Sequence, residues 1–408
     1  MKALVLCGGI PQIELLQNLK NRGIITVLAD MNEKVAARHY ADVFYPISVL
    51  DTDKVREVAQ IERVDFVISV CADQVLQVAA VVSKDLGLPC YIDAATAVNV
   101  SKKSHMKKLF VQHGVPTSKY VIAEHWHTTL LNGLTFPLIV KPVDSYSSRG
   151  VQKVHSLEEA CDAFEKAVRI SRSKTAIIEE YVEGPELTVD IYVEDAVAHI
   201  LCVSQLGKIG EDGKFVIHRT QNPADVSDTV MQKIQDAAQK IVQAFSLTNC
   251  PMLIQMIQCG DDISVVEFCA RTGGGDKFRL IKKVSDFDVV DAVVELTLGK
   301  KPHYEPSNRA AKYIVNEFLY CHPGVFDHME GLDVLQHEDV VSEYFILKTK
   351  GHIFENISSS GDRVAYYTIE ADDKKELMEK RLKANALVRA VDVNGMDLLR
   401  HDLITKAD

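Results

Sequence analysis

The first hundred residues alternate short apolar runs with helical patterns, and this alternation constrains the fold more than any other feature of the chain. Apolar runs at 2–9, 24–30 and 65–73 alternate with amphipathic helical patterns at 11–23, 51–64 and 74–87. Strands that alternate with helices in this way form a parallel sheet, because the chain must cross over between parallel strands. We therefore expect a doubly wound α/β domain at residues 1–100.

Gly8 and Gly9 follow the first apolar run, at the turn where many domains of this kind bind a phosphate. The spacing G-x-G-x-x-G of a dinucleotide site is absent. A tight turn between strand and helix is the simpler interpretation of the two glycines, and a nucleotide at this turn is the alternative.

Length and charge limit the classes of protein to consider. A chain of 408 residues is longer than one hydrophobic core usually serves, so two or three domains are expected. Its formal net charge of −11 argues against nucleic acid or an anionic membrane as the main partner. The 9 cysteines include no C-x-x-C pair, as is typical of the reducing cytoplasm, and no apolar stretch approaches the roughly 18 residues of a membrane span.

The segment "IVKPVDSYSSRGV" places Lys141 at the end of an apolar strand and follows it with small, polar residues. Hydroxyl groups of Ser147 and Ser148 and the backbone at Gly150 can close over phosphate oxygens, while the lysine adds a positive charge. The alternative is a surface hairpin with a lysine that reaches into solvent.

The segment "AIIEEYVEGPEL" ends a strand with Glu179 and Glu180 and continues through Tyr181 and Val182 to a Gly-Pro turn and Glu186. Free backbone groups at the end of a strand can bind the edge of an adenine ring, and a nearby acid can bind ribose hydroxyls. The alternative is an acidic loop that is simply solvated.

The segment "PMLIQMIQCGDDISVVEFCARTGGG" predicts a hairpin with strands at 252–258 and 263–269. Its register can place Gln255 opposite Glu267. A carboxylate in a buried strand is costly unless it is paired or binds a metal, and oxygen ligands of this kind suit Mg²⁺. Arg271 follows, and then Gly273, Gly274 and Gly275, where backbone N–H groups can approach a substrate. The alternative is a lone Glu267 that faces water.

The order of these segments resembles the ATP-grasp superfamily, in its carboxylate-amine ligase branch, which is like biotin carboxylase and the L-amino-acid ligases. The resemblance covers nearly the whole chain. It implies a pre-ATP-grasp domain at 1–100, an ATP-grasp domain at 101–305 with a lid at about 115–183, and an α+β C-terminal subdomain at 306–408 that contains one late helix.

The resemblance also implies roles for individual residues. Lys103 and Lys141 match the lysines that contact the nucleotide, and Lys141 contacts both phosphate and the adenine region. Arg271 and Lys141 are the expected catalytic residues, and Arg271 would stabilise the charge of the acyl phosphate. The segment from Ser145 to Gly150, with Ser147 and Ser148, matches the mobile flap. Further expected contacts with ATP are Glu179, Glu180, Tyr181, Val182 and Glu186. Glu267 and Gln255 match the Mg²⁺ ligands, with Mn²⁺ as a substitute. Expected contacts with the substrate are Gly273, Gly274, Gly275, Lys277, Arg279 and His218, with Arg219 as the alternative to His218.

Two positions depart from the family pattern. An acid is usual where this chain has Gln255, and an asparagine is usual where it has Cys269. Cysteine is a poor ligand for Mg²⁺, so a second metal ion is in doubt.

The resulting prediction is an ATP-dependent enzyme that forms a carbon–nitrogen bond through an acyl phosphate and releases ADP and phosphate. Its partners are a small carboxylate and an amine, in the cytoplasm, with the homodimer that is usual in the family. The alternatives are a biotin-type carboxylase, a purine-pathway ligase or carboxylase, and an ATP-binding regulator that no longer catalyses.

Overall fold

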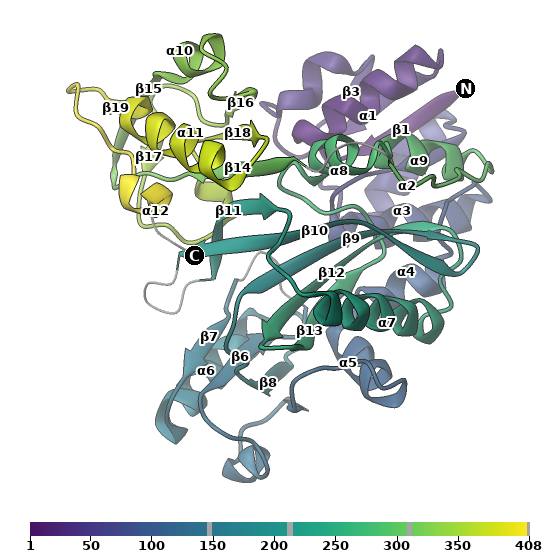
Figure 1. Cartoon of the computed structure of the whole chain (residues 1–408). Helices are drawn as coiled ribbons and strands as arrows, with labels where there is room; N and C mark the ends of the chain where they lie inside the picture. The colour runs from purple at the N-terminus through teal and green to yellow at the C-terminus, as the bar shows by residue number, and fades with distance from the viewer. Residues whose placement is uncertain (145–148, 210–214, 308–311, 406–408) are drawn as a thin grey trace.

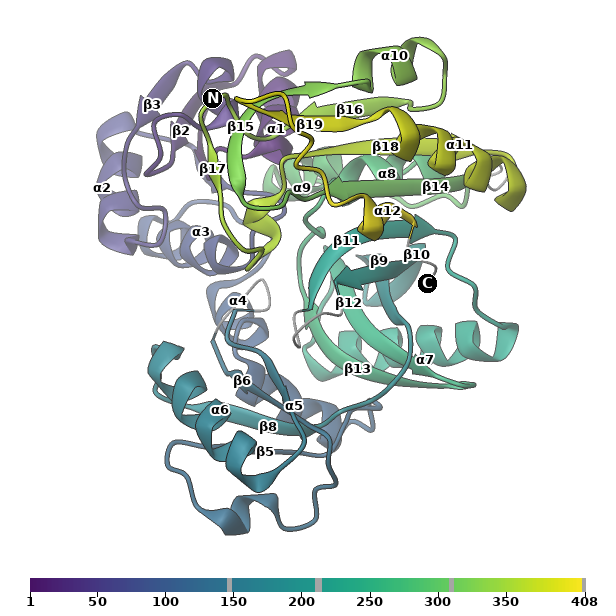
Figure 2. The same ribbon diagram turned by 90° about the vertical axis from the view of Figure 1, so that its left-hand side faces the viewer.

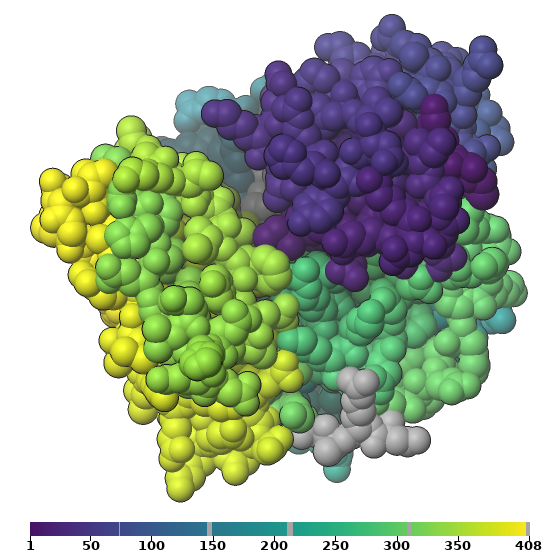
Figure 3. Space-filling view, turned by 90° about the horizontal axis from the view of Figure 1, so that it is seen from above, coloured from purple at the N-terminus to yellow at the C-terminus, as the bar shows by residue number. Residues whose placement is uncertain are grey.

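The computed structural model describes residues 1–144, 149–209, 215–307 and 312–405, apart from the side chain of Asp73. Four sheets organise these described residues (Figure 1). The N-terminal domain and the C-terminal segment lie side by side, as Figure 3 shows from above. A smaller sheet projects away from the rest at the bottom of Figure 2.

The N-terminal sheet is parallel, with strand order β3-β2-β1-β4. Alternate residues of β1 face opposite sides: Ala3 and Val5 pack with α1, while Leu4 and Leu6 pack with α2 and α3. Helices therefore cover both faces, which confirms the predicted doubly wound domain. The elements are β1 (Lys2–Leu6), α1 (Ile10–Asn21), β2 (Ile25–Ala29), η1 (Ala36–Tyr40), β3 (Val43–Tyr45), α2 (Thr52–Glu62), β4 (Phe66–Ile68) and α3 (Asp73–Leu86).

The turn after β1 supports the simpler interpretation of its glycines. The backbone N–H of Gly8 donates to Asp30 Oδ2 at 2.9 Å, so a carboxylate of the chain already occupies the position of an anion.

A second, antiparallel sheet has the order β5-β8-β6-β7, and helix α6 packs on it. It lies in the segment predicted to form the lid and is called the lid sheet. The linking helices α4 and α5 lead into it from the N-terminal domain (Figure 2). The elements are α4 (Ala94–Val100), α5 (Lys103–Gln112), β5 (Tyr120–Ala123), η2 (Thr128–Leu131), β6 (Leu138–Pro142), β7 (Gln152–Val154), α6 (Leu157–Ile170) and β8 (Ala176–Glu180).

The central sheet is antiparallel and has eight strands in the order β13-β12-β9-β10-β11-β14-β18-β16. Ile191 of β9 packs in the core with α7, and the next residue, Tyr192, packs with α8 and α9 on the opposite face. The elements are β9 (Glu186–Glu194), β10 (Val197–Ile209), β11 (Val216–Asn222), α7 (Asp228–Ala244), β12 (Cys250–Cys259), β13 (Asp262–Cys269), α8 (Lys277–Ser285) and α9 (Val289–Thr297).

The C-terminal segment continues this sheet, because β14 pairs with β11 along Ile314–Glu317. The pairing joins residues on both sides of position 305, and the domain boundaries at 100 and 305 stay predictions. A three-stranded sheet, β17-β15-β19, completes the segment. The elements are β14 (Tyr313–Leu319), β15 (Gly324–Glu330), α10 (Leu332–His337), β16 (Glu343–Ile346), β17 (Ile353–Phe354), η4 (Ser360–Asp362), β18 (Ala365–Ala371), α11 (Lys374–Leu387), β19 (Arg389–Asp392) and α12 (His401–Thr405).

The observed architecture confirms the predicted α/β and α+β fold class. Within the described part of the chain, every helix is too short or too polar to cross a membrane.

Candidate active site

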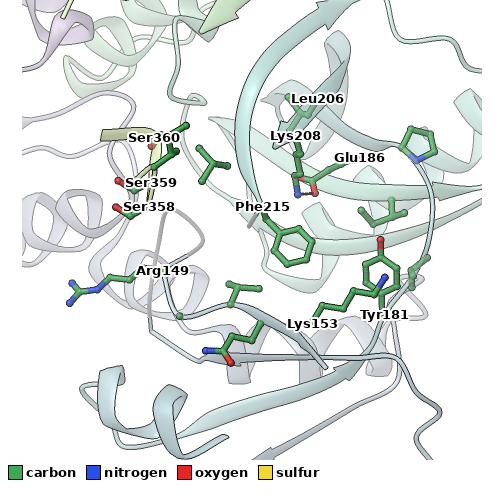
Figure 4. Close-up of a pocket in the computed structure, with 18 of the residues that line it drawn as sticks. Arg149, Lys153, Tyr181, Glu186, Leu206, Lys208, Phe215, Ser358, Ser359 and Ser360 are labelled. Carbon is green, nitrogen blue, oxygen red and sulfur yellow. Dashed lines mark hydrogen bonds and ion pairs between the residues drawn. The ribbon is translucent and has the colours of Figure 1, made fainter. Parts of the chain in front are cut away.

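A cleft lies between the lid sheet and the central sheet. Its inner part is a cavity of about 160 Å³ lined from the lid by Lys141 and Glu179 and from the central sheet by Gln255 and Glu267. It opens into a larger chamber of about 1470 Å³ that reaches Ser358–Ser360 of the C-terminal segment (Figure 4). Most of the predicted nucleotide contacts lie on the walls of these two cavities.

Glu179 is the centre of a buried charge network on the lid. It accepts from Lys141 on Oε1, and its Oε2 lies 2.8 Å from Lys107 Nζ and 3.1 Å from Ser118 Oγ. Burial raises the pKa of this carboxyl, but Lys141 and Lys107 outweigh burial and hold the pKa at about 2. Glu179 is therefore ionised and fixes the side chain of Lys141, a function that the sequence did not suggest.

Glu267 and Gln255 are direct partners across the β12–β13 ladder, as the hairpin register predicted. Lys103 Nζ lies 2.9 Å from Glu267 Oε2. A carboxylate and a neutral amide oxygen, facing a cavity that can hold phosphates, fit one Mg²⁺ ion, which commonly takes one or two carboxylates plus phosphate oxygens and water. The set includes no second carboxylate from this hairpin, in keeping with the doubt about a second ion.

Glu186 begins β9 and points into the cleft toward Lys208 of β10, which donates to its Oε2 (Figure 4). Its Oε1 accepts from Gln255 Nε2 at 3.4 Å. Glu186 thus orients the amide of Gln255, and its predicted contact with ribose stays a prediction.

The hinge between the lid and the central sheet passes through Tyr181, Val182 and Gly184. Lys153 Nζ lies 3.6 Å from the centre of the Tyr181 ring, and Figure 4 shows the two side chains together. Gly184 has a φ of +147°, and a Cβ on it would lie 1.8 Å from the carbonyl oxygen of Gln258, so only glycine fits. Glu180 lines the inner cavity and also accepts from the backbone N–H of Thr135 at 3.0 Å.

Of the predicted flap, Ser147 and Ser148 lie outside the described residues. Gly150 has a φ of +79° and lines the chamber beside Arg149.

Arg271 lies on the other side of Glu267. Its Nη1 donates to the carbonyl oxygen of Thr272 at 2.6 Å, and its side chain lines a second recess of about 210 Å³. Lys103 and Glu267 line both this recess and the inner cavity. The recess is completed by Asp144 and Arg172 of the lid and by Thr52, Gln74 and Gln77 of the N-terminal domain.

The glycine segment 273–275 runs between several buried groups, and helix α8 begins soon after it, as expected. A Cβ on Gly273 would lie 3.0 Å from Lys277 Cγ and 3.2 Å from Asp190 Oδ1. Lys277 lies 3.2 Å from Asp190 Oδ2, with side chains 5% and 2% exposed. Lys277 thus supports the segment from the core, and its predicted role as a substrate contact stays a prediction.

Arg279 is held by the C-terminal segment. Its Nη1 donates to Asp276 Oδ1 at 2.9 Å, and its guanidinium carbon lies 4.5 Å from the centre of the Phe345 ring. Asp276 has a left-handed φ of +67°, and burial raises the pKa of its carboxyl to about 7. The predicted contact between Arg279 and substrate stays a prediction.

Arg363 is a candidate that the sequence did not reveal. Its guanidinium carbon lies 3.7 Å from the centre of the Phe318 ring, and its Nε donates to the Tyr320 hydroxyl at 3.0 Å. Its Nη1 lies 3.7 Å from the position that a Cβ on Gly275 would take. A guanidinium held in this way beside the glycine segment can bind an anionic group of a substrate.

His218 and Arg219 are buried in β11, with 2% and 1% of their surface exposed. A Cβ on Gly207 of β10 would lie 3.0 Å from His218 Nε2. The cavities described above are lined instead by Phe215 and Ile217 of this segment. A role for His218 or Arg219 with substrate stays a prediction.

Sequence models of two known families match this chain. The ATP-grasp domain matches residues 134–278, and L-amino acid ligase C-terminal domain 2 matches residues 317–392. Residues 134–278 therefore form an ATP-grasp domain. The matched residues 134–278 include most of the lid sheet, the hinge and the β12–β13 hairpin, and therefore most of the walls of the cleft.

Curated relatives of this chain include formate-dependent phosphoribosylglycinamide formyltransferases. That of Ignicoccus hospitalis is 30% identical over 250 residues, which cover 59% of this chain and 62% of the relative. That of Escherichia coli O1:K1 is 24% identical over 320 residues, which cover 76% and 78%.

Solved structures of other proteins share nearly the whole architecture of this chain. The L-amino acid ligase from Bacillus licheniformis has a TM-score of 0.82 at 18% identity, covering 96% of this chain and 98% of that one. Phosphoribosylglycinamide synthetase from Anaerococcus prevotii has a TM-score of 0.76 at 18% identity, covering 96% and 99%. The predicted ATP-grasp domain is confirmed by the family match at residues 134–278.

Proposed function

We propose that this chain joins a small carboxylate to an amine at the expense of ATP. A carboxylate oxygen attacks the γ-phosphorus and ADP leaves, which gives an acyl phosphate. The amine nitrogen then attacks the acyl carbon, loses a proton, and phosphate leaves. Catalysis of this kind consists mainly of positioning and charge stabilisation.

The observation that carries the proposal is that the inner cavity and the recess share two lining residues. Lys103 and Glu267 line both of them, Lys141 lines only the inner one, and Arg271 lines only the recess. The γ-phosphate and the carboxylate would therefore meet between Lys103 and Arg271. Bound Mg²⁺, or Mn²⁺ in its place, would neutralise phosphate charge beside Glu267 and Gln255. Arg271 would stabilise the negative charge of the acyl phosphate and of the tetrahedral intermediate.

The surroundings of these shared residues favour an amino-acid-type substrate. The N-terminal wall of the recess offers the neutral side chains of Thr52, Gln74 and Gln77. Its volume of about 210 Å³ is below the roughly 300–1,000 Å³ of pockets for drug-sized ligands, so a small molecule fits best. Arg363, beside Gly275, is suited to a carboxylate group. The match of residues 317–392 to the L-amino acid ligase C-terminal domain supports the same choice.

A second candidate has formate as the carboxylate and a ribonucleotide amine as the acceptor. The curated relatives favour it, since they are named formate-dependent phosphoribosylglycinamide formyltransferases. It uses the same order of steps, so the two candidates differ in the ligands that fill the recess.

The test is ADP release by the purified full chain with ATP and Mg²⁺, with single amino acids, pairs of amino acids, or formate with phosphoribosylglycinamide. Release that requires an amino-acid pair supports the first candidate, and release that requires formate and the ribonucleotide supports the second. Release that depends on bicarbonate would indicate a carboxylase instead. ATP binding with no release under any condition would indicate a regulator and contradict the proposal.

A further inference from the structure

Lys103 forms an ion pair with Glu267, the carboxylate on which the predicted cation site depends. Its Nζ lies 2.9 Å from Glu267 Oε2, and the two side chains are 21% and 27% exposed. A partly buried pair is screened by salt much less than a pair on the surface. A divalent cation that approaches Glu267 in the empty cleft therefore competes with an ammonium group already in contact with it.

The other groups around Glu267 offer a bare cation little charge. Its cross-strand partner Gln255 is neutral and donates through Nε2 to Glu186, so the amide oxygen is the atom left to coordinate a cation. Glu186 is in turn paired with Lys208. Among the described residues, no group of three or more His, Cys, Asp or Glu side chains is placed to hold a metal ion.

A nucleotide phosphate would change this balance. Lys103 and Lys141 line the inner cavity, so a triphosphate placed there offers Lys103 another anion in place of Glu267. Glu267 then becomes available to a cation, and the phosphates supply the further oxygen ligands that Mg²⁺ usually takes from its substrate. The nucleotide thus releases Glu267 from Lys103 for the cation, and the cation neutralises the phosphate charge that the nucleotide places beside Glu267.

We propose that this cleft binds a divalent cation only together with the nucleotide, because Lys103 blocks Glu267 until a phosphate becomes the partner of Lys103. This inference rests on the proposed function, since it assumes ATP in the inner cavity. It concerns one ion, because Gln255 adds no negative charge to a second position. Coupling of this kind is reciprocal, so the cation strengthens nucleotide binding by the same factor.

The test measures binding of Mn²⁺ to the nucleotide-free full chain, from the electron paramagnetic resonance signal of free Mn²⁺. Wild type is expected to leave the signal unchanged, whereas Lys103→Met is expected to bind Mn²⁺ about tenfold or more tightly, where tenfold corresponds to 1.4 kcal/mol. Lys103→Gln gives the same comparison with a polar side chain. Thermal unfolding verifies that the variants are folded.

Lys153→Met is the matched control, because it removes a positive charge from the same cleft at a lysine that lies over the Tyr181 ring. It is expected to behave as wild type. The proposal is overturned if wild type binds Mn²⁺ without nucleotide as tightly as Lys103→Met, if the Lys103 variants bind no better than wild type, or if Lys153→Met gains as much as Lys103→Met.

A second arm adds a non-hydrolysable ATP analogue and titrates the metal. Wild type is then expected to bind about one Mn²⁺ per bound analogue, more tightly than the analogue alone binds it, and Gln255→Glu is expected to bind more Mn²⁺ than wild type. Ion binding equal in Gln255→Glu and wild type would contradict the assignment of Gln255. Failure of this inference differs from failure of the proposed function, in which the analogue itself would not bind or amine-dependent ADP release would be absent.

Discussion

Lys107 and Glu179 form a buried ion pair that ties helix α5 to strand β8 of the lid, with 2.8 Å between Nζ and Oε2. Their side chains are 2% and 7% exposed. Glu179 also accepts from Lys141, so one carboxylate fixes a lysine on either side of it. These contacts therefore hold the side chain of Lys141 in a fixed position on the wall of the cleft.

Replacement of Lys107 by methionine should destabilise the fold, because it leaves Glu179 buried with one positive partner instead of two. Loss of one partner of a buried pair costs about 3–5 kcal/mol, and the remaining Lys141 should keep the loss near the lower value. Urea denaturation measures it. Lys108→Met, at an exposed neighbour on the same helix, should change stability by no more than about 0.5 kcal/mol. Equal effects of the two changes would contradict the role assigned to Lys107.

Glu179 should make stability depend on acid pH. Burial opposes ionisation of Glu179, but Lys141 and Lys107 lower its folded-state pKa to about 2, below the ordinary 4.5. A group with a lowered pKa contributes stability above its unfolded-state pKa and loses that contribution as the pH falls through the folded-state pKa. The stability advantage of wild type over Glu179→Gln should therefore shrink between about pH 5 and pH 2 in chemical denaturation. A constant difference over this range would count against the network.

Glu267→Gln and Arg271→Ala should each abolish turnover while the fold is retained. Removal of one group that stabilises charge in a transition state costs about 10²–10³-fold in rate, and Glu267 also holds the predicted metal. ADP release with the active substrate pair, together with thermal unfolding, provides the measurement. Full activity of either folded variant would remove the proposed mechanism.

The stability of Asp276→Asn relative to wild type should increase as the pH rises. Burial raises the folded-state pKa of Asp276 from 3.8 to about 7, so the protonated form is the one that the fold prefers. For an acid with a raised pKa, stability is complete below the unfolded-state value and is lost as the pH rises through the folded-state value. The variant lacks this loss, so its melting temperature should gain on that of wild type between about pH 4 and pH 7. A difference that does not change with pH would contradict the assignment.

Gly184→Ala should disturb the hinge of the lid. The added Cβ would lie 1.8 Å from the carbonyl oxygen of Gln258, so β12 or the hinge must move, at a cost of about 1–3 kcal/mol. Gly260→Ala is a matched control, since Gly260 also has a positive φ but has no atom within 4 Å of the added Cβ. Gly184→Ala should lower both the free energy of unfolding and the affinity for an ATP analogue more than the control does. Equal impairment would leave backbone strain as the whole explanation.

Local patterns predicted much of this molecule. The hairpin that pairs Gln255 with Glu267 could be predicted from the sequence, because a short turn fixes the register of the two strands that it connects. The helix after the glycine segment and the strand that carries Lys141 were also predicted for local reasons, although that strand ends at Pro142.

Partners that are distant in sequence were not predicted. Lys107 was one of several lysines on a basic helix, and only the fold shows that it faces Glu179 while Lys108 faces solvent. Asp190 offered a signal that was overlooked, because a charge in the apolar run "ELTVDIYV" requires a partner, here Lys277. Arg363 gave no local signal, since its position beside Gly275 depends on how β14 and β18 join the central sheet.

The ladder between β11 and β14 limits how this protein can be divided. A fragment that stopped at residue 305 would leave the outer side of β11 without the strand that now satisfies its N–H and C=O groups. Bare strand edges recruit other chains, so such a fragment should self-associate. The C-terminal segment thus covers the edge of β11 against association with other chains, and it also forms a wall of the candidate active site.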